Sequence, residues 1–275
     1  MKSQKLDKKV RVMIVEDSAV VRELLRHVIS SDPHLEVAAA VSTAEEALRI
    51  LPRVAPDVVS LDIRLPGIDG LQATHRMMAD HPVPIVVVAG SVQSEDLNIA
   101  MNALRMGALA VVEKPVGVTA ADYERVARHL CTQLRIMSEV RVVRQRGARP
   151  TGPSEDRAVA VPPRTLPIPT AGTYDIVGLV ASTGGPKALM LVLNGLGAEF
   201  PLPVVLVQHI TSSFHAGFVQ WLDGVCALPV QEAQDGAVPQ PGHVYVAPAE
   251  QHPHVEGGRF CLDDAPPLKL QRPSG

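Results

Sequence analysis

A serine and a histidine stand at the ends of two successive strand-like segments in the second half of the chain. Ser182 follows the apolar run "YDIVGLVA" and opens "STGGP", and His209 ends "PVVLVQH" 27 residues later. A right-handed crossover brings such strand ends to one edge of a sheet. The glycines and Pro186 suit a sharp turn into a helix, whose free N–H groups could stabilise an oxyanion. Taken alone, this turn fits helix capping or phosphate binding equally well, but together with His209 it favours a serine nucleophile with a histidine base.

Four charged residues stand at the expected carboxyl ends of strands in the first half of the chain. Glu16 and Asp17 follow "VRVMIV", Asp62 closes "VVSLD", and Lys114 follows "LAVVE". In an open parallel sheet these ends share one crevice. Three converging carboxylates repel each other and call for a hard cation such as Mg²⁺, and a metal-neutralised aspartate can attack phosphorus. Acidic N-caps of unconnected helices are the alternative, but they leave the Lys-Pro pair at the last strand unexplained.

Alternating apolar and amphipathic segments would position these residues. In the first half we predict strands and helices in strict alternation, with strands at 10–15, 35–41, 57–63, 84–90 and 109–114 and helices at 18–31, 43–54, 69–80, 94–107 and from 120 onward. A second series starts with a buried-type strand and has strands at 174–181 and 203–209, helices at 186–196 and 212–225, and strand-like pieces at 242–248 and 252–262. Both halves are therefore expected to be doubly wound α/β domains with parallel sheets.

The expected domains are residues 10–130 and 173–275. Residues 131–172 comprise the end of a helix and a linker that is rich in Pro, Gly and Arg and has no periodic apolar face. The arginines between Arg141 and Arg149 could contact nucleic acid or acidic lipid. A solvated linker is the favoured interpretation because no aromatic residues accompany them.

Composition excludes several classes of protein. The net charge of −3 gives no overall attraction to nucleic acid or membrane. The first residues contain no apolar core of signal-peptide length, and no apolar run is long enough to span a bilayer, so we expect neither a signal peptide nor a spanning helix. The three cysteines are far apart, which predicts neither a disulfide framework nor a zinc site and fits a cytoplasmic protein. Four histidines raise the question of a metal site, but their spacing favours solvated loop positions, namely His215, His243, His252 and His254.

The first half resembles a response-regulator receiver domain of the flavodoxin-like fold. The matching pieces are "VEDS", "LDIRLPGIDG" and "EKP". The resemblance implies that Asp62 is the phosphorylation site, that Glu16, Asp17, Asp62 and the backbone carbonyl of Arg64 hold Mg²⁺, and that Lys114 contacts the phosphoryl group. It also implies a sensor histidine kinase as phosphodonor. One position departs from the family: the fourth strand ends with Ala89 where receivers carry a Ser or Thr switch residue, and Ser91 is the candidate substitute if the loop is bulged.

The second half resembles the effector domain of the CheB family of chemotaxis methylesterases. "ASTGGP", "QHI", "FHAGFVQWL", "EAQDGAVPQPGHVYVAP" and "LQRPSG" match in order. The resemblance implies a phosphorylation-regulated protein-glutamate methylesterase and protein-glutamine glutaminase acting on methyl-accepting chemotaxis receptors. It assigns Ser182 as nucleophile, His209 as general base and Thr183 as a polar neighbour, with no cofactor for the esterase. No nucleic acid and no direct membrane insertion are implied.

The family's third triad residue, an aspartate in a "GMG-x-DG" motif, does not occur in these 275 residues. Asp263 and Asp264 precede "RPS" and do not match that motif. We therefore expect a partial catalytic domain with weak or no activity in this chain. The rival hypothesis is a non-catalytic module that binds receptors and retains the receiver. A transcription regulator is disfavoured because no DNA-binding motif is present.

Overall fold

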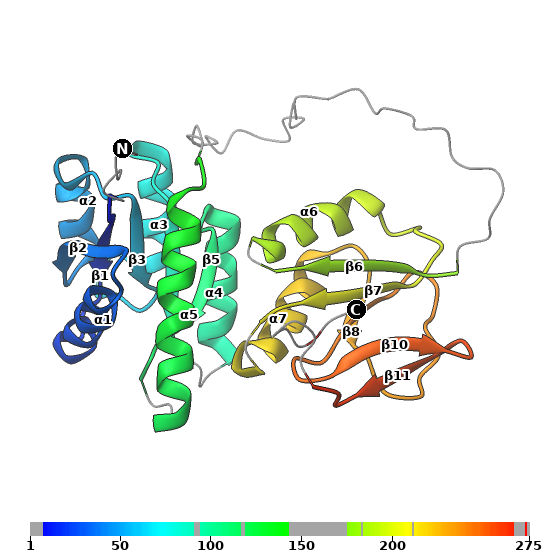
Figure 1. The fold of residues 1–275 in the computed structure, drawn as a ribbon. Coiled ribbons are helices and arrows are strands. Elements are labelled where there is room, and N and C mark those ends of the chain that lie inside the picture. Colours follow the sequence, from blue (N-terminus) through cyan, green and yellow to red (C-terminus); the bar gives the residue numbers. More distant parts are fainter. Residues whose placement is uncertain are drawn as a thin grey trace, which may run out of the picture.

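The computed structural model describes residues 8–90, 94–116, 119–142, 175–182, 184–210, 212–266 and 273. The predictions for Ser91 and Thr183, and for the linker beyond residue 142, lie outside these residues. The described elements form two α/β units and a β-hairpin (Figure 1). Within the described ranges, no helix combines the length and apolar character needed to span a membrane.

The first unit is a five-stranded sheet in the order β2-β1-β3-β4-β5, with every pair parallel. Its strands are β1 (Val10–Val15), β2 (Leu35–Val41), β3 (Val58–Asp62), β4 (Ile85–Ala89) and β5 (Ala110–Glu113). Its helices are α1 (Ala19–Ser31), α2 (Ala44–Val54), α3 (Gly70–Asp80), α4 (Ser94–Met106) and α5 (Ala120–Ser138). This strand order is that of the flavodoxin-like doubly wound fold, so the predicted fold class is confirmed.

Local sequence explains why these elements begin where they do. The helix caps are side chains that accept a backbone N–H from three residues ahead, provided by Ser18, Thr43, Asp69 and Thr119. The strands β3 and β4 are buried along their whole length, as expected for central strands covered by helices on both faces. Two apolar clusters pack on the sheet, and both the predicted strands and the predicted helices agree with the structure to within about a residue or two.

The second unit has a four-stranded parallel sheet in the order β6-β7-β9-β8. Its strands are β6 (Val177–Ala181), β7 (Val204–Gln208), β8 (Val230–Glu232) and β9 (Val244–Val246), and its helices are α6 (Gly185–Leu196) and α7 (Ser212–Val225). A separate antiparallel hairpin joins β10 (His252–Glu256) to β11 (Arg259–Asp263). The sequence did not predict β8, which is only three residues long.

Two expectations about the second unit are wrong. β6 was expected to be a buried strand, but it lies at the edge of the described sheet, and Val180 is 65% exposed. The histidines were expected in solvated loops, but only His243 lies outside a helix or strand. His215 is buried within α7, while His252 and His254 belong to β10. His252 is buried and His254 is exposed, although side chains two residues apart on a strand point to the same face.

The two units are in contact through α4, which packs against α7 and α6 (Figure 1). One continuous apolar cluster includes Met101 and Leu104 from α4 together with Phe214 and Phe218 from α7. The contact therefore has a buried hydrophobic component, which is characteristic of a defined domain interface.

Candidate functional site

The register of β6 and β7 brings Ser182 and His209 to the same edge of the second sheet. The last Cα pair of this ladder joins Ala181 to Gln208, so Ser182 and His209 are the next residues on each strand. The His209 N–H donates to the Ala181 carbonyl at 3.2 Å, which continues the ladder by one step. Ser182 is exposed and His209 half-buried. The crossover argument from the sequence thus predicted their neighbourhood correctly.

A buried glutamine ties these two strand ends together. The Nε2 amide of Gln208 donates to the carbonyl oxygen of Ser182 at 2.9 Å and to that of His209 at 3.0 Å. Gln208 is only 3% exposed, so its amide is shielded from water. Sequence reasoning did not single out this residue. The sequence feature that could have pointed to Gln208 is a polar residue at the end of an otherwise apolar strand.

Gly185 is required by the same arrangement. A Cβ atom added at Gly185 would lie 1.9 Å from Oε1 of Gln208 and 2.9 Å from Cβ of Ala181. Gly184, by contrast, has open space around it, but its φ of 76° lies in the left-handed region that favours glycine. The two glycines of the turn therefore have different roles: Gly184 allows the backbone to reverse, and Gly185 allows β7 to approach.

The His209 ring is held by a backbone carbonyl. Its Nε2 lies 2.8 Å from the carbonyl oxygen of Pro273. A carbonyl only accepts, so Nε2 carries the hydrogen and the lone pair of the neutral ring lies on Nδ1. Among the residues that the structure describes, no ion pair joins His209 to a carboxylate. Asp263 and Asp264 instead contact His254 and Gln251.

Residues of both units line the space above Ser182 and His209. A cavity of about 80 Å³ is bounded by these two residues and, from the first unit, by Leu104, Glu113 and Gln133. Ligand pockets usually measure about 300–1,000 Å³. The space that the two units enclose beside Ser182 is therefore smaller than an ordinary ligand pocket.

The acidic residues predicted in the first unit also come together. Ligand oxygens of Glu16, Asp17 and Asp62 all lie within 4.8 Å of one another. Nζ of Lys114 is 2.8 Å from Oε2 of Glu16 and 2.8 Å from Oδ2 of Asp62. The other carboxylate oxygen of Asp62 accepts the backbone N–H of Arg64 at 3.2 Å. Glu16, Asp62 and Lys114 are mostly withdrawn from water, whereas Asp17 is exposed.

Burial and mutual repulsion dominate the electrostatics of this cluster. Burial raises the pKa of Glu16, and the charge of Asp62 raises it further. Burial likewise raises the pKa of Asp62, although the ammonium of Lys114 opposes this. The pKa of Lys114 is raised because attraction to the two carboxylates outweighs the opposite effect of burial. A single ammonium thus leaves the carboxylates incompletely neutralised. An all-oxygen donor set with excess negative charge fits a hard divalent cation.

Ala89 lies fully buried at the end of β4, beside this cluster along the sheet edge. Its carbonyl accepts the N–H of Lys114 at 2.8 Å, so the backbone joins β4 and β5 at this point. The methyl side chain offers no hydroxyl at the position where receivers carry one.

Comparison with known families gives matches to both units. The model of the response regulator receiver domain matches residues 12–121, and that of the CheB methylesterase matches residues 177–274. A protein-glutamate methylesterase/protein-glutamine glutaminase of Paramagnetospirillum magneticum is 55% identical over 268 residues, covering 98% of this chain and 75% of the relative. The chain belongs to the CheB methylesterase family.

A second CheB-family relative, the enzyme of the same name from Nitrosospira multiformis, is 41% identical over 96% of this chain and 74% of its own length. The response regulator domain of Thermotoga maritima CheB is 29% identical, covers 49% of this chain and 99% of that domain, and has a TM-score of 0.44. The named relatives support an enzyme and do not support the non-catalytic alternative.

Proposed function

We propose that this chain is a protein-glutamate methylesterase and protein-glutamine glutaminase whose nucleophile is Ser182 and whose base is His209. The observation that carries the proposal is the β6–β7 register, which leaves these two residues side by side at one sheet edge. The match of residues 177–274 to the CheB methylesterase family supports the same reaction.

In the first half-reaction, Oγ of Ser182 attacks the carbonyl carbon of a glutamyl methyl ester, and its proton passes to His209. The proton is then donated to the leaving methoxide, which departs as methanol. Water attacks the acyl-serine with the same base and releases glutamate. With a glutamine side chain the first leaving group is ammonia instead. α6 begins at Gly185, three residues after Ser182, and the Gly185 N–H donates to the Ser182 carbonyl at 2.8 Å. In the proposed mechanism, N–H groups of this turn without an intrahelical partner stabilise the oxyanion.

The carbonyl of Pro273 fixes the His209 tautomer but carries no charge. A buried aspartate in that position also stabilises the imidazolium, and its loss costs about 10⁴-fold in turnover in serine proteases. Turnover of the described arrangement is therefore expected to be low but still dependent on Ser182.

The first unit would regulate access. Asp62 is the proposed phosphorylation site, with Glu16, Asp17 and the Arg64 carbonyl as ligands of Mg²⁺ and Lys114 as the phosphoryl contact. When bound, the ion neutralises charge on the phosphoryl group during transfer. The proposed phosphodonor is a sensor histidine kinase, and the proposed substrates are chemoreceptors.

Because α4 packs on α7 beside the small cavity at Ser182, a change at the Asp62 edge that moves α4 would open the path to Ser182.

Methanol release from methyl-esterified receptor tests the proposal. We expect slow release by the unmodified chain and faster release after addition of Mg²⁺ and a small phosphodonor. Asp62→Asn should keep the slow rate and lose the acceleration. Absence of methanol release from the wild-type chain under both conditions would contradict the function, and equal acceleration of Asp62→Asn would contradict the control mechanism.

A further inference from the structure

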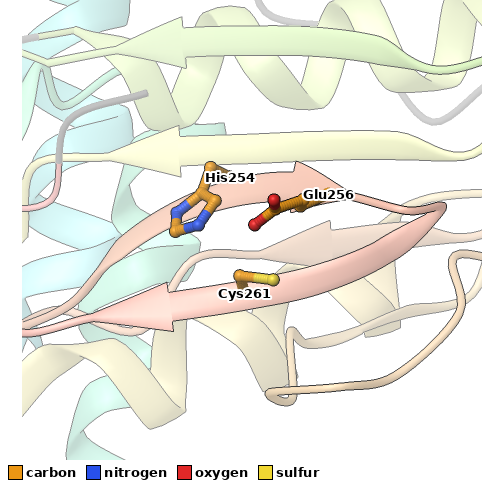
Figure 2. A group of neighbouring side chains, drawn as sticks. All are labelled: His254, Glu256 and Cys261. Carbon is orange, nitrogen blue, oxygen red and sulfur yellow. The ribbon is translucent and has the colours of Figure 1, made fainter.

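The β10–β11 hairpin carries a histidine, a glutamate and a cysteine on one face. His254 lies directly opposite Cys261 in the antiparallel register, and Glu256 is two residues from His254, so all three side chains point to the same side. One ligand atom from each lies within 4.8 Å of the other two. Figure 2 shows the three side chains facing one another across the two strands.

We propose that His254, Glu256 and Cys261 bind a zinc ion. Imidazole nitrogen, thiolate sulfur and carboxylate oxygen are the three donor types that zinc takes in proteins. The sulfur and nitrogen donors disfavour Mg²⁺ and Ca²⁺, which prefer oxygen. Three protein ligands leave one tetrahedral position for water. Cys261 binds as the thiolate, so one proton is released to solvent for each ion bound.

Asp263 completes the surroundings of the histidine. Its Oδ2 lies 3.4 Å from Nδ1 of His254, and both side chains are about half exposed. A carboxylate on one ring nitrogen orients the imidazole and leaves the other nitrogen for the metal. In this assignment Nε2 of His254 is the metal ligand, and Asp263 is a positioning residue.

The opposite face of the hairpin packs against the second unit and fixes the strands that carry the three ligands. Phe260 is fully buried and packs against Tyr245, with ring centroids 4.9 Å apart. Two hydrogen bonds anchor the backbone of the same strand: the Phe260 carbonyl accepts the Gly236 N–H at 2.7 Å, and the Leu262 N–H donates to Oδ1 of Asp235 at 2.9 Å. Ligands on anchored strands lose little conformational entropy on binding an ion.

Cysteine spacing could not reveal this site, because the ligands come from two strands and include only one cysteine. The turn that pairs them is Gly257–Gly258, and both glycines have positive φ, as in a two-residue type I′ turn. The hairpin is separate from the four-stranded sheet that carries Ser182 and His209. The ion is therefore assigned no step in ester hydrolysis.

Titration of the full chain with ZnCl₂, followed by calorimetry, tests the proposal. A non-chelating reductant keeps thiols reduced, and excess Mg²⁺ occupies the acidic cluster of the first unit. We expect one zinc per chain with proton release. Cys261→Ser and His254→Gln should each weaken binding at least tenfold, and Asp263→Asn by roughly ten- to a hundredfold. All three positions are solvent-accessible, so the variants should fold, which circular dichroism would check.

Matched variants and a second ion locate the site. Cys226→Ser and His243→Gln should leave zinc affinity unchanged. Co²⁺ should give a thiolate-to-cobalt absorption band that disappears in Cys261→Ser but persists in Cys226→Ser. The proposal would be overturned if the wild-type chain bound no zinc, or if zinc affinity were unchanged in both Cys261→Ser and His254→Gln. It would also be overturned if zinc binding were lost only in Asp17→Asn, since the ion would then occupy the first unit.

Discussion

The side-chain amide of Gln208 donates to the backbone carbonyl of Ser182 at 2.9 Å. The same nitrogen also donates to the backbone carbonyl of His209, the residue after Gln208, at 3.0 Å. One buried side chain thus joins the two strand ends that carry the proposed nucleophile and base, and these two hydrogen bonds form the Gln208 clamp. The relationship makes Gln208 a positioning residue, since it contacts the backbone of both residues and neither of their reactive groups.

Replacing Gln208 by leucine should reduce esterase turnover. The substitution removes both hydrogen bonds and leaves two carbonyls without their donor, and a displacement of about 1 Å near a reacting group can cost roughly a hundredfold. We expect a loss of about ten- to a hundredfold in kcat with a smaller change in KM. Gln231→Leu, on the exposed part of β8, is the matched control. Wild-type kcat in Gln208→Leu would show that the clamp has no part in positioning.

Gly185→Ala, at the first residue of α6, should perturb the same clamp. Its Cβ would lie 1.9 Å from Oε1 of Gln208, so the amide must move. Gly195 lies in the same helix with open space around its Cα, and Gly195→Ala should be neutral or should raise stability by about 0.5–1 kcal/mol. Thermal unfolding and methanol release on both variants compare the two positions. Equal behaviour of the two alanine variants would argue against the steric account.

Asp62→Asn should abolish phosphorylation by a small phosphodonor. In wild type the labelled phosphate should be acid-labile, and its formation should require Mg²⁺, because the carboxylate cluster needs a cation beyond Lys114. Asp122→Asn, on the exposed first turn of α5, is the control and should be labelled normally. Undiminished labelling of Asp62→Asn would remove the assignment of the phosphorylation site.

Cys131 and Cys226 should be slow to alkylate at neutral pH. Burial raises the pKa of each thiol to about 11, and nearby carboxylates act in the same direction. At pH 8 about one thiol in a thousand would be ionised, and the iodoacetamide rate should rise roughly tenfold per pH unit up to about pH 10. Peptide mass spectrometry of native and denatured chains measures this. Rapid labelling of either cysteine in the native chain at pH 7 would contradict the burial argument.

The sequence predicted the parallel strands of the first unit well because continuous apolar runs such as residues 84–90 are unambiguous when bounded by polar segments. It missed β8 because a three-residue strand next to Pro229 has too few side chains to show a period. It misjudged β6 because an apolar run does not distinguish a central strand from an edge strand. Val180 is exposed because β6 lies at the edge of the described sheet.

For the site, chain order and crossover geometry were sufficient to bring Ser182 near His209 and Asp62 near Lys114. The hydrogen bonds of Gln208 could not be predicted from sequence, because their two acceptors are backbone carbonyls at the ends of two different strands. The sequence also placed His254 in a solvated loop, whereas it lies on β10. Its pairing with Cys261 could not be predicted, because that residue belongs to the other strand of the hairpin. Contacts between strands depend on register, which local patterns in a single segment do not specify.

Methanol release by Ser182→Ala and His209→Gln tests the central claim most directly. Ser182→Ala should reduce release from methyl-esterified receptor to background, and His209→Gln should reduce it by about 10²–10⁴-fold, the usual contribution of a general base. Ser212→Ala and His243→Gln, both in the same unit, should retain the wild-type rate. Release that persists at the wild-type rate in Ser182→Ala would contradict the serine-hydrolase account.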